Sequence, residues 1–146
     1  MFKRILLATD GSSHAEEALG YAKELASRDG AQVVVVHAFE PVPTYLGDPW
    51  EDRVYGGHVA AGQEVADLVA DKLQAAGVKV VVEVLEGPAA DAILRVAAVR
   101  ACDLIVMGSR GHGALTSLLL GSVSHRVLAH ARAPVLIVRA TEEEAE

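Results

Sequence analysis

Residues 103–124 read DLIVMGSRGHGALTSLLLGSVS, and this stretch decides the fold class that the sequence predicts. The apolar run at 104–107 is followed by glycines at positions 108, 111 and 113, and a further glycine at 121 stands directly before Ser122. A short apolar run that leads through a glycine-rich turn into a helical pattern is typical of a strand whose carboxyl end faces a ligand in an α/β protein. Residues 8–13, ATDGSS, repeat this arrangement after an earlier apolar run.

Five apolar runs are spaced along the chain, and they centre on Leu6, Val35, Val82, Ile105 and Leu136. Most are nearly continuous, as expected for strands of a parallel sheet that are covered on both faces. The third run alternates in part, through Lys79, Glu83 and Glu86, which predicts a more exposed position at the edge of the sheet.

The segments between these runs follow the helical period instead. Their predicted apolar stripes are, in chain order, Ala15, Ala18, Leu19, Ala22 and Ala26; Ala61, Val65, Leu68, Val69 and Leu73; Ala90, Ile93, Leu94 and Ala97; and Val123, Val127 and Leu128. Gly30 and Gly77 are predicted to end the first two helices. Regular alternation of strands and helices predicts an open, doubly wound, Rossmann-like α/β sheet with helices on both faces.

Length and charge narrow the classes of partner. The chain has 146 residues, 51% hydrophobic and 23% charged, which predicts a single domain over residues 1–140 followed by an acidic tail at 141–146. The net charge of −7, with no cluster of Lys or Arg, argues against nucleic acid partners. No leader and no apolar run near the ~18 residues of a membrane span are present, so we expect a cytoplasmic protein without a membrane partner.

The single cysteine, Cys102, is expected to be a buried, unreactive thiol.

Residues 40–57, EPVPTYLGDPWEDRVYGG, are predicted to be irregular. The segment has three prolines, two tyrosines and the only tryptophan, and it is longer than the usual connection in such folds. Two interpretations remain open for it: a variable loop that closes over a site as a lid, or a partly disordered excursion.

Ligands of open parallel sheets bind beyond the carboxyl ends of the strands, where the winding direction reverses. If the first and fourth strands are neighbours there, one crevice is surrounded by Thr9, Asp10, Gly108, Gly111, Gly121 and Ser122. Glycine amides and a helix N-terminus favour a phosphate group, so these residue types predict a nucleotide. Asp10 suits a ribose hydroxyl or a Mg²⁺ ion that bridges to the phosphates. Ser124 offers a second hydroxyl, and Arg110 could add positive charge.

Competing motifs fail on spacing. Ala114 and Leu115 occupy the Lys and Ser/Thr places of a Walker A loop, and Thr116 stands where a dinucleotide fingerprint needs its third glycine. A Ser-His-Asp hydrolase built from Ser124, His112 and Asp10 lacks anything that would activate the serine. None of the six histidines has a recognised metal spacing, and we expect none of them to be a metal ligand.

The spacing Gly108, two residues, Gly111, nine residues, Gly121-Ser122 resembles the nucleotide-binding signature of the ATP-binding branch of the universal stress protein family. The stretches ILLATDGS, DLIVMGSRG and GSVSHRVLAHARAPVLIV are also similar to that family, so the resemblance covers nearly the whole chain. It implies a five-stranded parallel sheet in the order 3-2-1-4-5, of the adenine nucleotide alpha hydrolase-like type. It also implies ATP accompanied by Mg²⁺ or Mn²⁺, and a homodimer formed through the fifth strand, Val135 to Val138.

The resemblance further assigns positions around the nucleotide. Ala8, Thr9 and Asp10 would lie along adenine and ribose, Ala38 against the base, and Met107 behind the site. The remaining residues would surround ribose and phosphates: Gly108, Gly111, Gly121, Ser122, Val123 and Ser124.

No evident general base and no committed lysine stand near Ser122, as hydrolysis of ATP would require. We therefore expect a nucleotide-binding stress-response or signalling protein rather than an enzyme, with any ATP hydrolysis slow or dependent on an unknown downstream partner. The alternative is a binding or scaffold protein of the same fold that uses AMP, a cyclic nucleotide or a protein partner. A nucleotidyl-transfer enzyme on a related sheet is a distant third.

Overall fold

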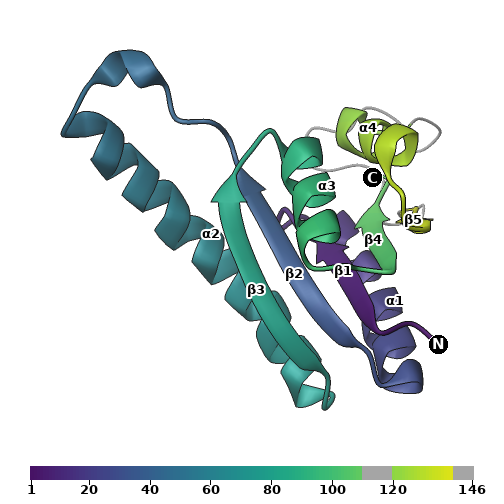
Figure 1. The fold of residues 1–146 in the computed structure, drawn as a ribbon. Coiled ribbons are helices and arrows are strands. Elements are labelled where there is room, and N and C mark those ends of the chain that lie inside the picture. The colour runs from purple at the N-terminus through teal and green to yellow at the C-terminus, as the bar shows by residue number, and fades with distance from the viewer. Residues whose placement is uncertain (110–119, 140–146) are drawn as a thin grey trace.

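The computed structural model describes residues 1–109 and 120–139, with strands and helices in strict alternation (Figure 1). The elements are β1 (Arg4–Ala8), α1 (Ser13–Asp29), β2 (Gln32–Phe39), the 3₁₀-helix η1 (Thr44–Leu46), α2 (Trp50–Ala75), β3 (Lys79–Glu86), α3 (Ala89–Val99), β4 (Leu104–Gly108), α4 (Ser122–His130) and β5 (Val135–Val138).

All five strands form one parallel sheet in the order β3-β2-β1-β4-β5, which confirms the predicted topology. β1 is the central strand, with Leu6 paired to Val34 of β2 on one side and to Ile105 of β4 on the other. The chain winds from β1 outward to β3 and then crosses back to β4. The reversal of winding therefore lies between β1 and β4, as expected.

The sheet separates two apolar layers, since successive side chains of a strand point to opposite faces. In β1, Ile5 and Leu7 pack with α1 and α2, whereas Leu6 packs with α3 and α4, and none of the three is exposed. Figure 1 shows the two helix pairs on opposite sides of the sheet. β3 is one of the two edge strands and is partly exposed along its length, which confirms the interpretation of its alternating sequence.

The predicted stripe of α1 is buried throughout, and Gly30 ends this helix as predicted. Gly30 has a left-handed backbone, with φ 69°, and its N–H donates to the carbonyl of Ala26. Glycine adopts this conformation without a steric penalty, which explains its place after the last turn.

The predicted stripe of α2 contains two errors and that of α4 contains one. Leu68 is 65% exposed, Leu128 is 44% exposed and Ala61 is also exposed, although all three were expected to be buried. In α2 the buried residues are instead Gly62, Ala66, Val69, Ala70 and Leu73. A β-carbon on Gly62 would lie 2.8 Å from side-chain atoms of both His37 and Val84. α2 can therefore pack this closely against β2 and β3 only because residue 62 has no side chain. Glycine does not count as apolar in a sequence pattern. The pattern of larger residues therefore predicted a buried face of α2 that is rotated about the helix axis from the one observed.

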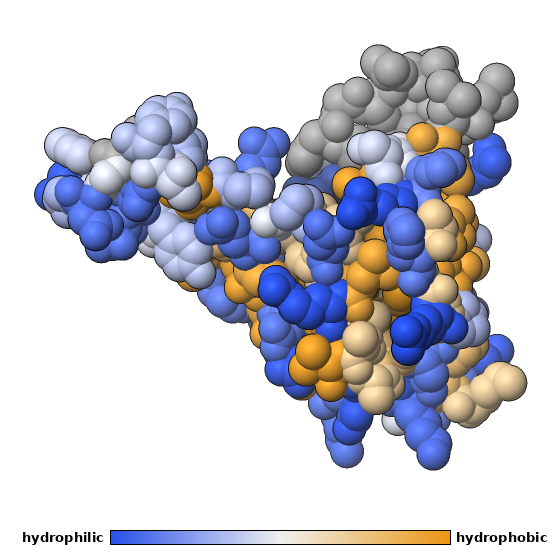
Figure 2. Space-filling model, turned by 45° about the horizontal axis from the view of Figure 1, so that its top comes forward, coloured by the Kyte–Doolittle hydropathy of each residue, from blue (hydrophilic) through white to orange (hydrophobic). Residues whose placement is uncertain are grey.

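Residues 40–57 are more regular than predicted, because the first turns of α2 begin at Trp50. Irregular backbone is limited to 40–43 and 47–49. Residues 40–57 form an arm, which Figure 2 shows projecting at the left from the body of the molecule. Its base is held by Phe39, whose ring meets those of Tyr55 and His58 edge to face, while Arg53 lies over the Trp50 ring at 5.1 Å.

Cys102 is buried, as predicted, and burial raises the pKa of its thiol. The thiol therefore stays protonated at neutral pH. Because only the thiolate is a good nucleophile or metal ligand, this cysteine is unreactive. Within residues 1–109 and 120–139, no helix is both long enough and apolar enough to cross a lipid bilayer.

Asp29, at the end of α1, ties the beginning of the chain to that helix. Its carboxylate accepts the backbone N–H of Phe2 at 2.9 Å and the Nε–H of Arg28 at 2.9 Å. The hydrogen bond from Arg28, followed by that from Phe2, holds the pKa of Asp29 well below its usual range.

Replacing Gly62 by Ala should destabilise the protein, whereas replacing Gly57 in the same helix should not. Overpacking typically costs about 1–3 kcal/mol, more than the gain of about 1 kcal/mol that Ala brings to a helix interior. Gly57 has open space around it, so Gly57→Ala should show only the gain. Chemical denaturation of the two variants measures the difference, and equal stabilisation by both would mean that α2 is not seated on the sheet at Gly62.

The Asp29→Asn variant should be less stable than the parent at pH 7, and the difference in stability between the two proteins should narrow in acid. An Asp in the unfolded chain titrates near about pH 3.9, and the folded pKa lies below that value. The stabilisation is therefore complete above the unfolded pKa and is lost as the pH falls through the folded pKa. Thermal unfolding from pH 7 to 2 tests this, with exposed Asp71→Asn as control. A gap of constant size at every pH would contradict it.

Candidate functional site

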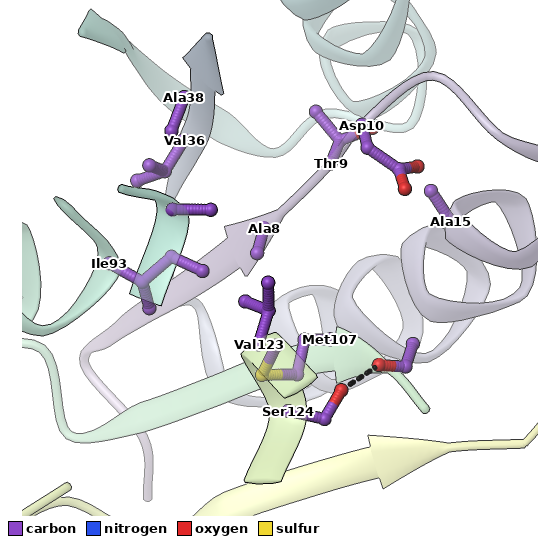
Figure 3. Close-up of a pocket in the computed structure, with 12 residues that line it drawn as sticks. Ala8, Thr9, Asp10, Ala15, Val36, Ala38, Ile93, Met107, Val123 and Ser124 are labelled. Atoms are coloured by element: carbon purple, nitrogen blue, oxygen red, sulfur yellow. Dashed lines mark hydrogen bonds between the residues drawn. The ribbon is translucent and has the colours of Figure 1, made fainter. Parts of the chain in front are cut away.

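A pocket of about 110 Å³ opens at the carboxyl ends of β1, β2 and β4, where α3 and α4 begin (Figure 3). It lies beside the point at which the winding of the sheet reverses, the usual place for a ligand in an open parallel sheet. The residues that line it are Ala8, Thr9, Asp10, Ala15, Val36, Ala38, Ala89, Ile93, Met107, Gly108, Val123 and Ser124.

One side of the pocket is apolar. Val36 and Ala38 are two apart in β2 and so project to the same face, with Ile93 of α3 beside them in Figure 3. Met107 of β4 is buried beneath and Val123 of α4 lies beside it. These walls of small and branched side chains suit a flat, apolar group such as an aromatic ring.

The turn after β1 supplies the polar side. Asp10 directs its carboxylate back to its own turn, where Oδ1 accepts the N–H of Ser12 at 2.9 Å. This hydrogen bond is an Asx turn, a local role expected of Asp at such a position. Gly11 has φ +82°, a conformation that favours glycine, and lets the chain turn into α1. The Asp10 carboxylate is therefore held at the mouth of the pocket by the turn itself.

The turn is also tied to the neighbouring strand. The N–H of Thr9 donates to the carbonyl of Val36 at 2.9 Å, and the carbonyl of Thr9 accepts a hydrogen bond from Nδ1 of His37, also at 2.9 Å. A carbonyl can only accept, so the geometry assigns the proton to Nδ1 of this imidazole.

The start of α4 closes the polar side. Gly121 is the N-cap, and its N–H donates to the carbonyl of Ser109 at 2.7 Å. The first intrahelical bond runs from His125 to Gly121, so the amides of the three residues between them have no acceptor within the helix. The Ser124 hydroxyl lies 2.8 Å from the carbonyl of Gly108 and 3.1 Å from that of Ser109, and donates its one proton there. Ser124 thus fastens the helix to β4 and keeps only acceptor capacity for a ligand.

Eight of the twelve residues predicted for the site line this pocket: Ala8, Thr9, Asp10, Ala38, Met107, Gly108, Val123 and Ser124. Gly121 and Ser122 lie next to it at the start of α4 but do not line it. Arg110 and Gly111 fall outside the described residues.

The prediction missed four lining residues. Val36 could have been found, because it precedes Ala38 by two positions in the same strand and must share its face. Ala15, Ala89 and Ile93 carry no such signal, since their place depends on how α1 and α3 pack against the sheet.

A larger hollow of about 620 Å³ lies alongside α3, lined among others by Arg4, Glu83, Arg95 and Arg100. Its charges are largely used within the fold. Arg100 pairs with Glu83, and Arg4 donates to the Arg100 carbonyl at 3.0 Å. It is lined by the first residues of β1 and β2, Arg4 and Gln32, rather than by their carboxyl ends, so the smaller pocket is the better candidate.

Among the described residues, no group of three or more His, Cys, Asp or Glu side chains could hold a metal ion. Asp10 is the one carboxylate among the residues that line the pocket. The described part of the chain therefore shows no cluster of metal-ligating side chains at this pocket.

Comparison with known proteins agrees with this architecture. The model of the universal stress protein family matches residues 1–139. A universal stress protein of Thermus aquaticus is 46% identical over 140 residues, which cover 95% of this chain and all of that protein. The structure of protein MJ0577 of Methanocaldococcus jannaschii is similar with a TM-score of 0.90 and 27% identity, covering 97% of this chain and 99% of that one.

Two further similar structures contain nucleotides. One is a universal stress protein in complex with cAMP, with a TM-score of 0.74, 24% identity and coverage of 96% and 99% of the two chains. The other is a family protein of Arabidopsis thaliana with AMP bound, with a TM-score of 0.73, 20% identity and coverage of 99% and 95%. With a family match over almost its full length and a close relative of equal extent, the chain belongs to the universal stress protein family.

Proposed function

We propose that this protein binds an adenine nucleotide, ATP in particular, in the pocket at the carboxyl ends of β1, β2 and β4, and acts as a nucleotide-dependent stress-response or signalling module. Membership of the family supports this, as do the AMP and cAMP bound to two proteins of similar fold. The observation that carries the proposal is the division of the pocket into an apolar wall and a polar end formed by the β1–α1 turn and the start of α4.

The size of the pocket decides how a nucleotide would lie. Sites that enclose a whole drug-sized ligand usually measure about 300–1,000 Å³, so about 110 Å³ accommodates the base alone. Val36 and Ala38 would flank the base. Ribose and phosphates would then extend along the mouth toward α4, where free backbone amides and the positive end of the helix dipole favour negative charge.

A divalent cation, Mg²⁺ or Mn²⁺, fits this arrangement only as a companion of the phosphates. Mg²⁺ is typically held by one or two carboxylates together with substrate phosphates, and Asp10 contributes the carboxylate among the described residues that line the pocket. Its carboxylate would meet a cation or a ribose hydroxyl at the mouth of the pocket. The cation would neutralise phosphate charge beside Asp10.

The residues that line the pocket favour binding over catalysis. Phosphoryl transfer needs a group that orients the nucleophile and cations that stabilise the transferring group. Asp10 is the one titratable side chain among the lining residues that the structure describes, and the Ser124 proton is committed to backbone carbonyls. We infer that the nucleotide regulates recognition by another molecule, with AMP or a cyclic nucleotide as the alternative ligand.

Titration of the nucleotide-stripped protein should show ATP with Mg²⁺ binding more tightly than AMP. Two variants separate the ends of the site. Ala38→Leu fills the apolar wall and should weaken both nucleotides by at least about tenfold, or about 1.4 kcal/mol. Gly121→Leu should weaken ATP far more than AMP, because it crowds only the start of α4. Calorimetry measures the six affinities, of ATP and AMP for the parent and for each variant.

Ala61→Leu, on the exposed face of α2, is the matched control and should bind as the parent does. A parent protein that binds neither nucleotide would refute the function. Binding that neither pocket variant changes would refute the location.

We also propose a homodimer formed through β5 (Val135–Val138), whose outer edge has no partner strand within the described chain. Exposed edges invite pairing with a second chain. The N–H groups of Ile105 in β4 and of Ser109, directly after β4, donate to the carbonyls of Pro134 and Val138. In a parallel ladder, alternate residues of a strand bond to opposite neighbours, so the N–H of Ile137 points away from β4 to the outer edge.

The Ile137→Pro variant should therefore be monomeric, because it removes an outward donor while keeping the bonds between β4 and β5. Ile137→Ala loses the same side chain but keeps the N–H, and it should remain dimeric. Sedimentation at micromolar concentration compares the two variants with the parent. A monomeric parent, or a dimer in all three, would show that β5 does not form the interface.

A further inference from the structure

His37 stands in β2 between two residues that line the pocket, Val36 and Ala38, yet it faces the other side of the sheet. There its ring lies against α2. A β-carbon on Gly62 would be 2.8 Å from Cδ2 of the imidazole and 3.4 Å from Nε2. The ring therefore has a fixed position, with the backbone of a helix closing the space behind it.

The fixed ring holds the end of β1. That strand ends at Ala8, and the N–H of Thr9 makes one more ladder bond, to the carbonyl of Val36. In a continuing parallel ladder the Thr9 carbonyl would accept a backbone N–H of β2. Here it accepts Nδ1–H of His37 at 2.9 Å. The side chain of His37 thus replaces a backbone donor of β2 at the point where the chain after β1 leaves the sheet.

This bond sets the direction of the turn that bears Asp10. The carbonyl of Thr9 and the N–H of Asp10 belong to one planar peptide group, so orienting the carbonyl orients the start of Asp10. Two hydrogen bonds within the turn, from Gly11 to the Thr9 hydroxyl at 3.4 Å and from Ser12 to Asp10, span only two residues each. These two bonds shape the turn but do not attach it to the sheet.

We propose that His37 is the positioning residue of the site: its Nδ1–H bond to the Thr9 carbonyl orients the Thr9–Asp10 peptide and so controls ligand affinity from the opposite face of the sheet. The claim about affinity rests on the proposed nucleotide function, whereas the claim about the turn stands apart from it. Because Gly62 leaves just enough room for the ring, a change in α2 would reach the pocket by the same route.

The test compares His37→Leu, which removes the donor, with His37→Asn, whose side-chain amide can donate from a similar position. His37→Leu should weaken ATP with Mg²⁺ and AMP by a similar factor, about three- to tenfold, since one hydrogen bond is lost and α4 is untouched. His37→Asn should recover most of the affinity. A residue that serves only the fold would lower the melting temperature of both variants without this split in affinity.

A second readout does not depend on the ligand. Backbone amide NMR of the unliganded protein should show shifts at Asp10, Gly11 and Ser12 in His37→Leu and in Gly62→Ala, and near-parent positions in His37→Asn. Nitrogen NMR of the parent imidazole should show the proton on Nδ1. A proton on Nε2 alone, or an unchanged turn in His37→Leu, would overturn the proposal.

Nucleotide affinity and amide chemical shifts together distinguish a failure of the proposed function from a failure of the positioning role of His37. A parent protein that binds no nucleotide would refute the proposed function, while the amide shifts would still decide whether His37 orients the turn. A parent that binds, with His37→Leu binding equally well, would refute the positioning role and leave the nucleotide site in place.

Discussion

The pairing of β1 with β2 on one side and β4 on the other is the constraint on which the structure depends. Parallel strands cannot be joined by tight turns, so each pairing requires a helical crossover, and the crossovers must cover both faces of the sheet. Because the winding reverses at β1, the segments after β1 and β4 diverge to opposite faces. The space between them is the pocket, which is thus a result of topology before it is a result of any particular side chain.

Side chains then give that space its chemistry. Small and branched residues line the part that continues the layer under α3 and α4, and the polar groups come from the chain ends that leave the sheet. Two side chains hold those ends in place. His37 holds the turn after β1, and Ser124 holds the start of α4 against β4. Both donate to backbone carbonyls, so the two polar ends of the site are held in place by hydrogen bonds within the protein itself.

Periodic patterns and strand ends predicted the five strands, the helices between them and the polar loops at the switch point, whereas the strand order and site residues such as Ala38 and Met107 followed from the resemblance to the family. Continuous apolar runs such as that around Val35 identify strands buried on both faces, and the loops after Ala8 and Gly108 mark the switch point. Leu68 was misplaced because Gly62, which seats α2, is invisible to an apolar pattern. Ile93 was missed because its place depends on the packing of α3 rather than on any local pattern.

The lengths of α2 and of the strands it covers do not match, and the excess has an evolutionary meaning. A helix of 26 residues is about 39 Å long, whereas strands of eight residues extend about 26 Å. The overhang of roughly 13 Å is the projecting arm. Whole turns can be added or removed there without rotating Gly62 or shifting the strand register, so this end of the protein is free to diversify while the pocket at the carboxyl ends of the strands stays unchanged.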